Sequence, residues 1–398
     1  MTTMRAVRLM AWQSRPELVE VPVLRPRPGE VLLAVEAVGL CHSDLHLMDS
    51  PPGVLPFRPP FTLGHEVVGR VVLTGDGVAP DWVGRMVAVH GVWSCGICRN
   101  CRRGRENYCF RLSGPVGCGL GRDGGLAEFM IVDDIRRLVS IDGVDPVLAA
   151  PLTDAGLTVY HALSGHRDVL GGAGTGGAGT GSGGTGSGGV GSGGVVVVIG
   201  IGGLGHIAVQ ILRATTSSAV VAVDVREPAR HLATRLGASA VARTPQEAAA
   251  AVERLSGGDG ADVVLDLVGS TETLRAGAEL LAVGGAITVV GSAGGILSLG
   301  KNTGIPRGWA VRAPFWGPRD DLRAVLDLAR TGAITTTAEV VGLDDAVEAY
   351  ERLRRGDIDG RVVVVPSPGR AVVPSSSRKE FADETTRTGV RGAGGSHA

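Results

Sequence analysis

The second half of the chain alternates short apolar segments with longer amphipathic ones, and this alternation constrains the fold most strongly. Four valine-rich segments have the character of buried strands: VVVVIG, AVVAVD, ADVVLDLVG and AITVVG. Between them lie helical stretches such as PARHLATRLGA and TETLRAGAELLA. Strands joined by helices run parallel, because each helical crossover returns the next strand in the same direction. From Val195 onward the sequence therefore predicts an α/β fold with a doubly wound parallel sheet.

A glycine fingerprint, Gly200-Ile-Gly202-Gly203-Leu204-Gly205, follows the first of these strands and opens a helical stretch. The first glycine of such a motif allows a tight turn, and the second lets the backbone approach a pyrophosphate. The third permits close packing of the helix on the strand. Because the N-terminus of that helix also presents unpaired N–H groups to an anion, the motif predicts a dinucleotide site.

Asp224 ends the second strand, AVVAVD, and favours one dinucleotide over another. A carboxylate at this place accepts hydrogen bonds from a ribose 2′-OH and repels a 2′-phosphate. The alternative is an aspartate that only caps the following helix. Arg226 lies nearby and weakens the preference, but we expect NAD rather than NADP.

The first 150 residues contain many short Val- and Leu-rich segments separated by turn signals, such as EVLLAVEAVGL, EVVGRVVLTG and GRMVAVH. This pattern predicts a compact β-barrel-like domain. After Trp316 come two helical stretches, DDLRAVLDLARTG and LDDAVEAYERLRRG, and a last strand, RVVVVP. Residues 171–194, of which 15 are glycine, and the polar tail 367–398 cannot bury enough apolar surface to fold. We expect a flexible insertion and a disordered tail there.

Four cysteines lie close together in the first half, spaced C-x2-C-x2-C-x7-C, namely Cys95, Cys98, Cys101 and Cys109. Four thiolates at this spacing can surround one ion tetrahedrally, as in a closed structural zinc site. A redox C-x-x-C pair, a disulfide and an iron–sulfur cluster are the alternatives. A redox motif needs only two cysteines, however, and the basic, polar residues between these four suit an exposed loop. The sequence predicts a structural zinc lobe at about residues 93–112.

Composition excludes several classes of function. The chain has 398 residues, 20% charged and 44% hydrophobic, which is ordinary for a soluble protein of two domains. A net charge of −1 gives no field that would attract nucleic acid or anionic membranes. The N-terminus lacks the apolar segment of a signal peptide, and the metal-type cysteine motifs suit a reducing compartment. We expect a cytoplasmic protein that binds neither nucleic acid nor membrane.

Two further segments carry residue types that bind metals. Gly39-Leu-Cys41-His42-Ser43-Asp44-Leu-His46 follows a strand, and Gly64-His65-Glu66 opens another. Together with the four-cysteine lobe and the glycine fingerprint, they closely resemble the motifs of medium-chain zinc-dependent alcohol dehydrogenases, over about residues 4–366. The resemblance implies a GroES-like catalytic domain, 1–157 and 317–366, and an NAD-binding Rossmann domain, 158–316.

The resemblance also implies a second, catalytic zinc. Cys41 and His65 would be ligands, with Glu66 as an adjacent carboxylate and Asp44 as the acceptor that orients His65. Many family members have cysteine where this chain has Asp154. The aspartate resembles a bacterial subgroup of secondary-alcohol dehydrogenases with Cys, His and Asp ligands. A carboxylate is an acceptable zinc ligand, although an aspartate that caps a helix without touching metal is the alternative.

Further roles follow from the same resemblance. Zinc would lower the pKa of the alcohol oxygen, hydride would pass to the nicotinamide, and Ser43 and His46 would relay the proton. Trp93, Phe315 and Trp316 fall where family members line the substrate channel, which favours an apolar alcohol or ketone, though such aromatics also occur in plain cores. The implied cofactor-binding set is Thr158, Gly200, Gly202, Gly203, Leu204, Gly205, Asp224, Val268, Val290, Phe315 and Arg361.

The expected activity is thus the NAD-linked interconversion of primary or secondary alcohols with aldehydes or ketones, by a homo-oligomer that is a dimer or a tetramer with two zinc ions per chain. A polyol or amino-alcohol dehydrogenase of the same superfamily is the second interpretation, against which the aromatic residues weigh. A non-catalytic, zinc-stabilised NAD sensor is the third. The joint presence of the catalytic-type residues at positions 41, 43, 46, 65 and 66 argues against a sensor.

Overall fold

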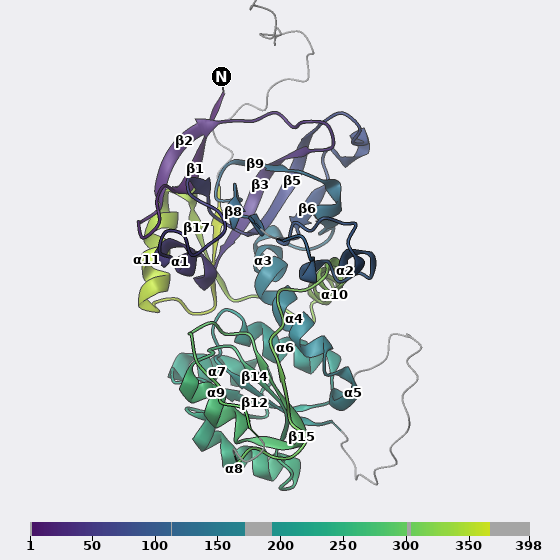
Figure 1. The fold of residues 1–398 in the computed structure, drawn as a ribbon, viewed down its shortest axis with the longest axis vertical. Helices are drawn as coiled ribbons and strands as arrows, with labels where there is room; N and C mark the ends of the chain where they lie inside the picture. The colour runs from purple at the N-terminus through teal and green to yellow at the C-terminus, as the bar shows by residue number, and fades with distance from the viewer. Residues whose placement is uncertain (1, 113, 172–192, 301–303, 367–398) are drawn as a thin grey trace, which may run out of the picture.

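The computed structural model describes residues 2–112, 114–171, 193–300 and 304–366. The predicted insertion, 171–194, lies outside this part except at its ends, and the predicted tail, 367–398, lies outside it entirely. Figure 1 shows two halves stacked along the long axis of the molecule. One half contains strands from both ends of the chain, and the other contains the central part of the chain.

The central part of the chain folds around a six-stranded parallel sheet. The strands lie side by side in the order β13 (Ala240–Ala242), β12 (Ala219–Val223), β11 (Val195–Ile199), β14 (Ala261–Asp266), β15 (Leu281–Val289) and β16 (Ala310–Arg312). Helices α6 (Gly205–Thr215), α7 (Glu227–Arg235), α8 (Pro245–Ser256) and α9 (Thr271–Ala278) connect successive strands. Counted along the chain the order is 3-2-1-4-5-6, so the predicted doubly wound sheet is confirmed.

The valine run of β11 explains why this strand is central. All of its residues are buried, and it pairs in parallel with β12 on one side and β14 on the other. A strand covered by helices on both faces has no exposed side, so it contains a continuous apolar run rather than an alternating one. The glycine fingerprint follows directly at its carboxyl end, which is the edge where such sheets bind ligands.

The other half joins the two ends of the chain in one sheet. Its main strands lie in the order β10 (Leu138–Ser140), β6 (Met86–Val89), β5 (Glu66–Thr74), β3 (Val31–Leu40), β18 (Arg361–Val365) and β17 (Ala338–Gly342), and β9 (Phe129–Val132) also pairs with β3. A three-stranded sheet contains β2 (Glu17–Pro22), β1 (Thr3–Leu9) and β4 (Phe61–Thr62), and β7 (Gly117–Cys118) pairs with β8 (Gly121–Arg122). The antiparallel pairing of β18 with β3 brings Arg361 into the same sheet as Glu66.

One long helical segment runs between the halves. It consists of α3 (Pro146–Pro151), the π-helical turn η4 (Leu152–Gly156) and α4 (Leu157–Ser164), and α10 (Arg319–Arg330) packs against it (Figure 1). Helix α1 (His42–Asp49) follows β3 and packs on α11 (Ala346–Arg355). The remaining helical pieces are short: α2 (Arg99–Arg102), α5 (Arg167–Leu170), η1 (Pro80–Trp82), η2 (Glu106–Tyr108), η3 (Ile135–Arg137) and η5 (Leu343–Asp345).

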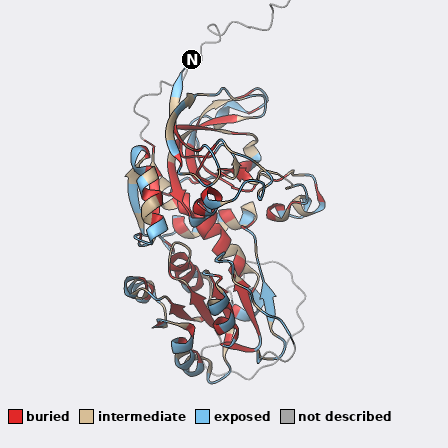
Figure 2. Ribbon diagram, turned by 60° about the vertical axis from the view of Figure 1, so that its left-hand side comes forward, coloured by how far each residue is buried: buried red, intermediate tan, exposed pale blue. Residues whose placement is uncertain are grey.

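Buried residues fill the middle of both halves and the helical segment between them (Figure 2). Among the helices in the described ranges, none has the length and apolar character needed to cross a membrane. One predicted helix is too long: TETLRAGAELLA becomes α9, which ends at Ala278, and β15 begins at Leu281. Leu281 pairs with Ala261 of β14, so strand pairing in the tertiary structure overrides local helix propensity there.

Glu106 attaches the four-cysteine lobe to the rest of the fold. Its Oε1 accepts hydrogen bonds from the backbone N–H of Arg319 at 2.9 Å and from its Nε at 3.0 Å. The neighbouring Asn107 side chain donates to the carbonyl of Phe315 at 2.8 Å. Burial raises the pKa of Glu106, but the hydrogen bonds from Arg319 outweigh it and hold the pKa below its usual value.

We expect Glu106→Gln to lower the free energy of unfolding by about 1 kcal/mol at pH 7, because hydrogen bonds to a charged acceptor are stronger than neutral ones by about that amount. The folded-state pKa is depressed, so this contribution is complete above the unfolded pKa of about 4.3 and is lost as pH falls through the folded pKa. Urea unfolding of both proteins between pH 7 and about pH 3, which extends below the unfolded pKa, measures it. The exposed Glu348→Gln serves as control, and a difference that does not shrink on acidification would contradict the assignment.

Candidate active site

The four cysteines of the lobe converge on one point. Sulfur–sulfur distances are 3.3 Å between Cys98 and Cys101, 3.9 Å between Cys95 and Cys101, and 4.0 Å between Cys98 and Cys109. All four are free thiols, so the disulfide alternative is wrong for this structure. Sulfur atoms held about 2.3 Å from one tetrahedral ion stand about 3.8 Å apart, and the observed spacing fits a zinc ion.

The ionisation of these thiols also points to a cation. Backbone N–H groups, that of Cys101 foremost, lower the pKa of Cys98 to about 6. Burial, together with the neighbouring thiols, raises the pKa of Cys101 to about 12. Four sulfurs this close cannot all become thiolates without a positive charge between them, and zinc supplies that charge.

A second group of donor atoms lies between the two halves. This metal-type cluster contains Cys41, His65, Glu66 and Asp154, which are all buried. Each residue contributes one donor atom, and these four atoms all lie within 4.8 Å of one another. The Sγ of Cys41 is 3.7 Å from Oδ2 of Asp154, and Nε2 of His65 is 3.4 Å from the same oxygen. Three residues far apart in the sequence therefore place a sulfur, a nitrogen and an oxygen around one position.

Asp44 orients His65 for this role. Its Oδ1 lies 3.0 Å from Nδ1 of the imidazole, and its Oδ2 accepts hydrogen bonds from the backbone N–H of Cys41 at 3.1 Å and from the hydroxyl of Tyr350 at 2.9 Å. With Nδ1–H held by the carboxylate, Nε2 presents its lone pair to the other donor atoms. Nε2 is buried and has no hydrogen-bond partner among the described residues, which is what a metal ligand requires.

Asp154 owes its position to an irregular helix. It lies in the π-helical turn η4, directly after Pro151, which has no N–H to continue the regular pattern. The helix continues on both sides, so the alternative in which Asp154 caps a helix is not what the structure contains. Oδ1 of Asp154 accepts a hydrogen bond from the hydroxyl of Thr158 at 3.0 Å, which leaves Oδ2 directed toward Cys41 and His65.

Glu66 faces the cofactor side of the same group. Its Oε2 is paired with Nη2 of Arg361, and both side chains are buried. Burial raises the pKa of Glu66 to about 7, and the charge of Arg361 opposes this rise. Oε1 of Glu66 has no hydrogen-bond partner in the described part of the chain, so one oxygen remains available next to the donor atoms.

The electrostatics of this group favour a cation. Burial lowers the pKa of His65, but Asp44, Asp154 and Cys41 outweigh it, and the pKa lies well above the usual value. The surrounding acidic groups thus favour a positive charge at this position more strongly than burial disfavours it. A thiol, an imidazole and a carboxylate are all good zinc ligands, and this donor set fits zinc.

The glycine fingerprint forms the turn that a dinucleotide needs. Gly200 has φ +93°, which favours glycine, and a Cβ on Gly205 would lie 2.0 Å from the carbonyl oxygen of Gly200. A Cβ on Gly202 would meet nothing within 4 Å. The loop therefore packs closely against the sheet, and its middle faces open space where a pyrophosphate can approach the backbone.

Asp224 lies directly after β12 and bonds the glycine loop. Its Oδ2 accepts from the N–H of Ile201 at 2.8 Å, and its Oδ1 accepts from the N–H of Arg226 at 2.8 Å. Helix α7 begins with Arg226 as its N-cap residue, so Asp224 is not the cap of that helix. The guanidinium of Arg226 lies 3.4 Å from Asp224 and 3.3 Å from Asp359.

Of the remaining expected cofactor residues, Leu204, Val268 and Val290 lie at the same edge of the parallel sheet, whereas Thr158, Phe315 and Arg361 lie outside that sheet. Val268 and Val290 follow β14 and β15, and Leu204 is the N-cap of α6. A Cβ on Gly203 would lie 2.6 Å from Nη1 of Arg361, which shows how closely that side chain approaches the loop. Thr158, by contrast, contacts Asp154, and Phe315 is 41% exposed with its carbonyl bonded to the lobe.

Ser43 and His46 both lie on the exposed face of α1. The Oγ of Ser43 is 3.6 Å from Sγ of Cys41, and Nδ1 of His46 is 3.3 Å from Oγ of Ser292, which follows β15. Residues three apart on a helix are neighbours, so the two side chains lead from the metal-type cluster toward the surface. Ser292 and Tyr350 carried no recognisable sequence signal, since each acts only through a partner distant in the chain.

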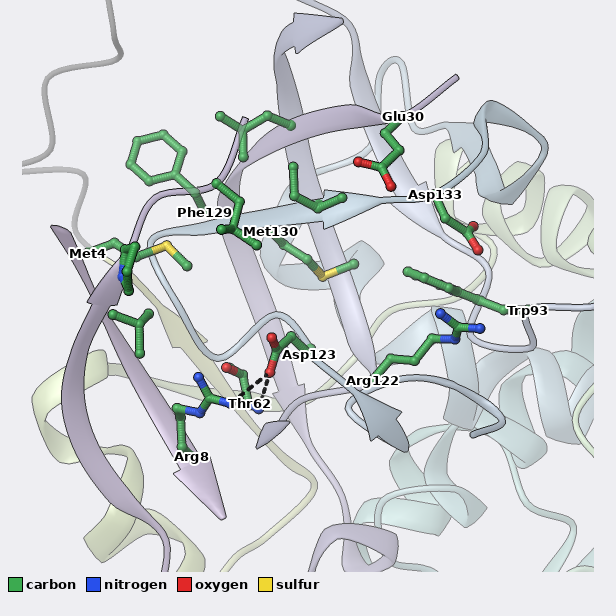
Figure 3. A pocket seen from close by; sticks show the side chains of 16 residues that line it. Met4, Arg8, Glu30, Thr62, Trp93, Arg122, Asp123, Phe129, Met130 and Asp133 are labelled. Atoms are coloured by element: carbon green, nitrogen blue, oxygen red, sulfur yellow. Dashed lines mark hydrogen bonds and ion pairs between the residues drawn. The ribbon is translucent and has the colours of Figure 1, made fainter. Parts of the chain in front are cut away.

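The three aromatic residues expected to line a substrate channel have different partners in the structure. The ring of Trp316 lies 5.7 Å from that of His65 and is buried. Trp93 stacks on Arg122 and Arg137, at 5.4 Å and 5.7 Å. Figure 3 shows it beside Arg122 in a cavity of about 270 Å³, whose lining does not include the metal-type cluster.

Comparisons with known proteins agree with this geometry. Residues 27–143 match the alcohol dehydrogenase GroES-like domain, and residues 203–331 match the zinc-binding dehydrogenase domain. An NAD-dependent alcohol dehydrogenase of Sulfurisphaera tokodaii is 32% identical, over 91% of this chain and all of that protein. A D-arabinose 1-dehydrogenase (NADP(+)) of Saccharolobus solfataricus is also 32% identical, over 92% of this chain and 99% of that protein.

Among solved structures, the acetophenone reductase of Geotrichum candidum in complex with NAD is similar, with a TM-score of 0.75 and 32% identity, over 92% of this chain and 98% of that one. The predicted combination of a doubly wound sheet with a GroES-like domain is confirmed by these matches. The chain belongs to the medium-chain zinc-dependent alcohol dehydrogenase family.

Proposed function

We propose that this protein is an NAD-linked, zinc-dependent alcohol dehydrogenase that interconverts alcohols with aldehydes or ketones. The observation that carries the proposal is the meeting of Cys41, His65 and Asp154 around one position, with Arg361 joining that cluster to the glycine loop. A metal cluster alone would be structural, and a dinucleotide loop alone would bind without reaction. Their direct connection favours hydride transfer chemistry.

Cys41, His65 and Asp154 would hold the catalytic zinc, and the four cysteines of the lobe would hold a structural one. When bound, zinc supplies a Lewis acid that lowers the pKa of a substrate hydroxyl, and NAD supplies the hydride acceptor. The protein contributes orientation: Asp44 holds the imidazole, Thr158 holds the carboxylate, and the ring of Trp316 packs beside His65. Ser43 and His46 give a proton a path from the cluster to the surface.

An apolar substrate is favoured over a polar one. Trp316 packs beside His65, and the similar acetophenone reductase is named for an aryl ketone. A polar substrate is the second candidate, because a relative of equal identity is named for D-arabinose. A panel of primary, secondary and aryl alcohols and of sugars, each assayed with NAD and NADP, separates the two. Turnover confined to sugars would refute the apolar substrate, and no turnover at all would refute the enzyme.

The proposal includes a cytoplasmic homo-oligomer without nucleic-acid or membrane partners. Six free cysteines support a reducing compartment. All three residues of β16, the last strand of the parallel sheet in the described residues, are exposed, and the open side of an edge strand is a ready place for self-association. Sedimentation equilibrium distinguishes a monomer, a dimer and a tetramer.

We expect two zinc ions per chain in the unaltered protein. Cys98→Ser should remove one zinc and destabilise the fold, because a closed site contributes folding energy. His65→Ala should remove the other zinc and lower kcat/KM by about a thousandfold or more with the fold retained. Elemental analysis, circular dichroism and activity are measured together.

The control is Cys118→Ser. Cys118 is buried but lies outside both clusters, so this variant should keep both zinc ions. One zinc in the unaltered protein after zinc-replete expression would contradict the assignment.

We expect NAD to be preferred, and Asp224→Asn to narrow the preference over NADP by about tenfold. The asparagine keeps one oxygen, which can accept from the N–H of Ile201 in the loop, but it loses the second acceptor, for the N–H of Arg226, and the charge that repels a 2′-phosphate. The ratio of kcat/KM for the two cofactors measures it. Glu227→Gln removes an exposed charge nearby and should leave the ratio unchanged. Equal kcat/KM values in the unaltered protein would refute the role of Asp224.

A further inference from the structure

His206 is a buried residue in the first turn of α6, immediately after the glycine fingerprint. Both of its ring nitrogens have partners, and the partners belong to different parts of the molecule. Nδ1 lies 2.9 Å from the carbonyl oxygen of Gly202, in the middle of the cofactor loop. Nε2 lies 3.3 Å from the backbone N–H of Thr337, in the segment that enters β17.

These contacts determine the tautomer of the ring. A backbone N–H can only donate, so Nε2 must accept and be unprotonated. The proton is then on Nδ1 and is donated to the carbonyl of Gly202. Burial lowers the pKa of His206 to about 4, so the neutral ring that both contacts require persists at neutral pH.

The segment around Thr337 is held from two sides. Gln210, one turn further along α6, donates to the carbonyl of Thr335 at 2.8 Å and accepts from its N–H at 2.9 Å. On the other side, the carbonyl of Thr337 accepts from the backbone N–H of Arg361 at 2.8 Å. The segment thus connects helix α6 of the cofactor half with the first residue of β18.

Arg361 completes a closed path of contacts. Its side chain is paired with Glu66 of the metal-type cluster and approaches Gly203 of the cofactor loop. Starting from Gly202, the path runs through His206 and Thr337 to Arg361, and from Arg361 back to the loop. The side chain of His206 and the backbone of Thr337 thus link the carbonyl of Gly202, which also accepts from the backbone N–H of His206 at 3.3 Å, to the residue that contacts Glu66.

We propose that His206 is a positioning residue for hydride transfer: its Nδ1–H sets the orientation of the Gly202 peptide for the dinucleotide, and its Nε2 ties that loop to Thr337 and so to Arg361. The two bonds have separate tasks. The bond to Gly202 favours cofactor binding, and the bond to Thr337 transmits binding to the catalytic half. This inference rests on the proposed NAD-linked function and assigns a role to a residue outside the reacting groups.

Three substitutions separate the two bonds. In His206→Asn the side-chain amide stands where Nδ1 stood, so the bond to Gly202 is kept and that to Thr337 is lost. In His206→Gln the longer side chain places its oxygen where Nε2 stood, so the bond to Thr337 is kept and that to Gly202 is lost. His206→Leu removes both and keeps the bulk. The exposed His231→Leu on α7 is the matched control.

Two measurements need no alcohol. The NAD dissociation constant should rise about tenfold in His206→Gln and His206→Leu, and stay within about twofold in His206→Asn and the control, as expected for one hydrogen bond. Hydrogen exchange of the Thr337 amide should be protected in the unaltered protein and in His206→Gln, and fast in His206→Asn and His206→Leu. Adding NAD should slow exchange at residues 335–337 in the unaltered protein, but no longer in His206→Asn.

The third measurement is the single-turnover rate of hydride transfer at saturating NAD. It should fall about tenfold in His206→Asn and stay within about twofold to threefold in His206→Gln. A merely space-filling histidine predicts the same losses in both variants, and that result would overturn the proposal. Unchanged NAD affinity together with unchanged hydrogen exchange of the Thr337 amide in all three His206 variants would also overturn the proposal. An inactive unaltered protein would refute the proposed dehydrogenase, while the exchange and affinity measurements would still decide the role of His206.

Discussion

The buried ion pair between Arg361 and Glu66 holds the guanidinium that links the metal-type cluster to the cofactor loop. Both residues begin strands of the same sheet, β18 and β5, with β3 between them. Breaking such a pair leaves a buried charge without a partner, which is strongly destabilising, so the pair favours the observed register of β18 against β3. That register places the guanidinium of Arg361 against Gly203, and the cofactor loop meets the metal-type cluster as a result.

The metal-type cluster and its surroundings bring several buried acidic side chains close together, which is unfavourable for folding. Asp44, Asp154 and Glu66 are buried within reach of one imidazole. Carboxylates with no cation between them would repel one another in a region of low dielectric. A zinc ion removes that repulsion, so the arrangement costs stability in the empty protein and gains it when metal binds.

The helix that carries Asp154 also contributes to the contact between the halves. Its π-helical turn sets the direction of the carboxylate, and Thr158, one turn later, holds it. Helix α10 packs on the same turn. A ligand that sits at an irregular point of a packed helix is fixed more rigidly than one on a loop, because neighbouring side chains hold the irregular backbone on several sides.

The local features of the sequence were sufficient for much of the architecture. The valine runs, the glycine fingerprint and the cysteine spacing each lie within about thirty residues, and such motifs determine local geometry by steric and hydrogen-bonding rules that need no distant partner. The doubly wound sheet and its glycine turn could therefore be predicted from composition and order alone. The resemblance of the scattered motifs to one family added the metal-type residues at positions 41, 65 and 154, which the structure places together.

Contacts between distant residues were decided only in the tertiary structure. The sequence did not indicate that Thr158, which was expected at the nicotinamide, holds Asp154, or that Trp93, which was expected at the substrate, stacks on two arginines. Tyr350, Ser292 and Thr337 have no local signal at all, since each contacts a residue more than a hundred positions away. Sequence patterns determine which face of an element is buried, but the direction of a polar side chain depends on which partner the packing of other elements brings within hydrogen-bond distance.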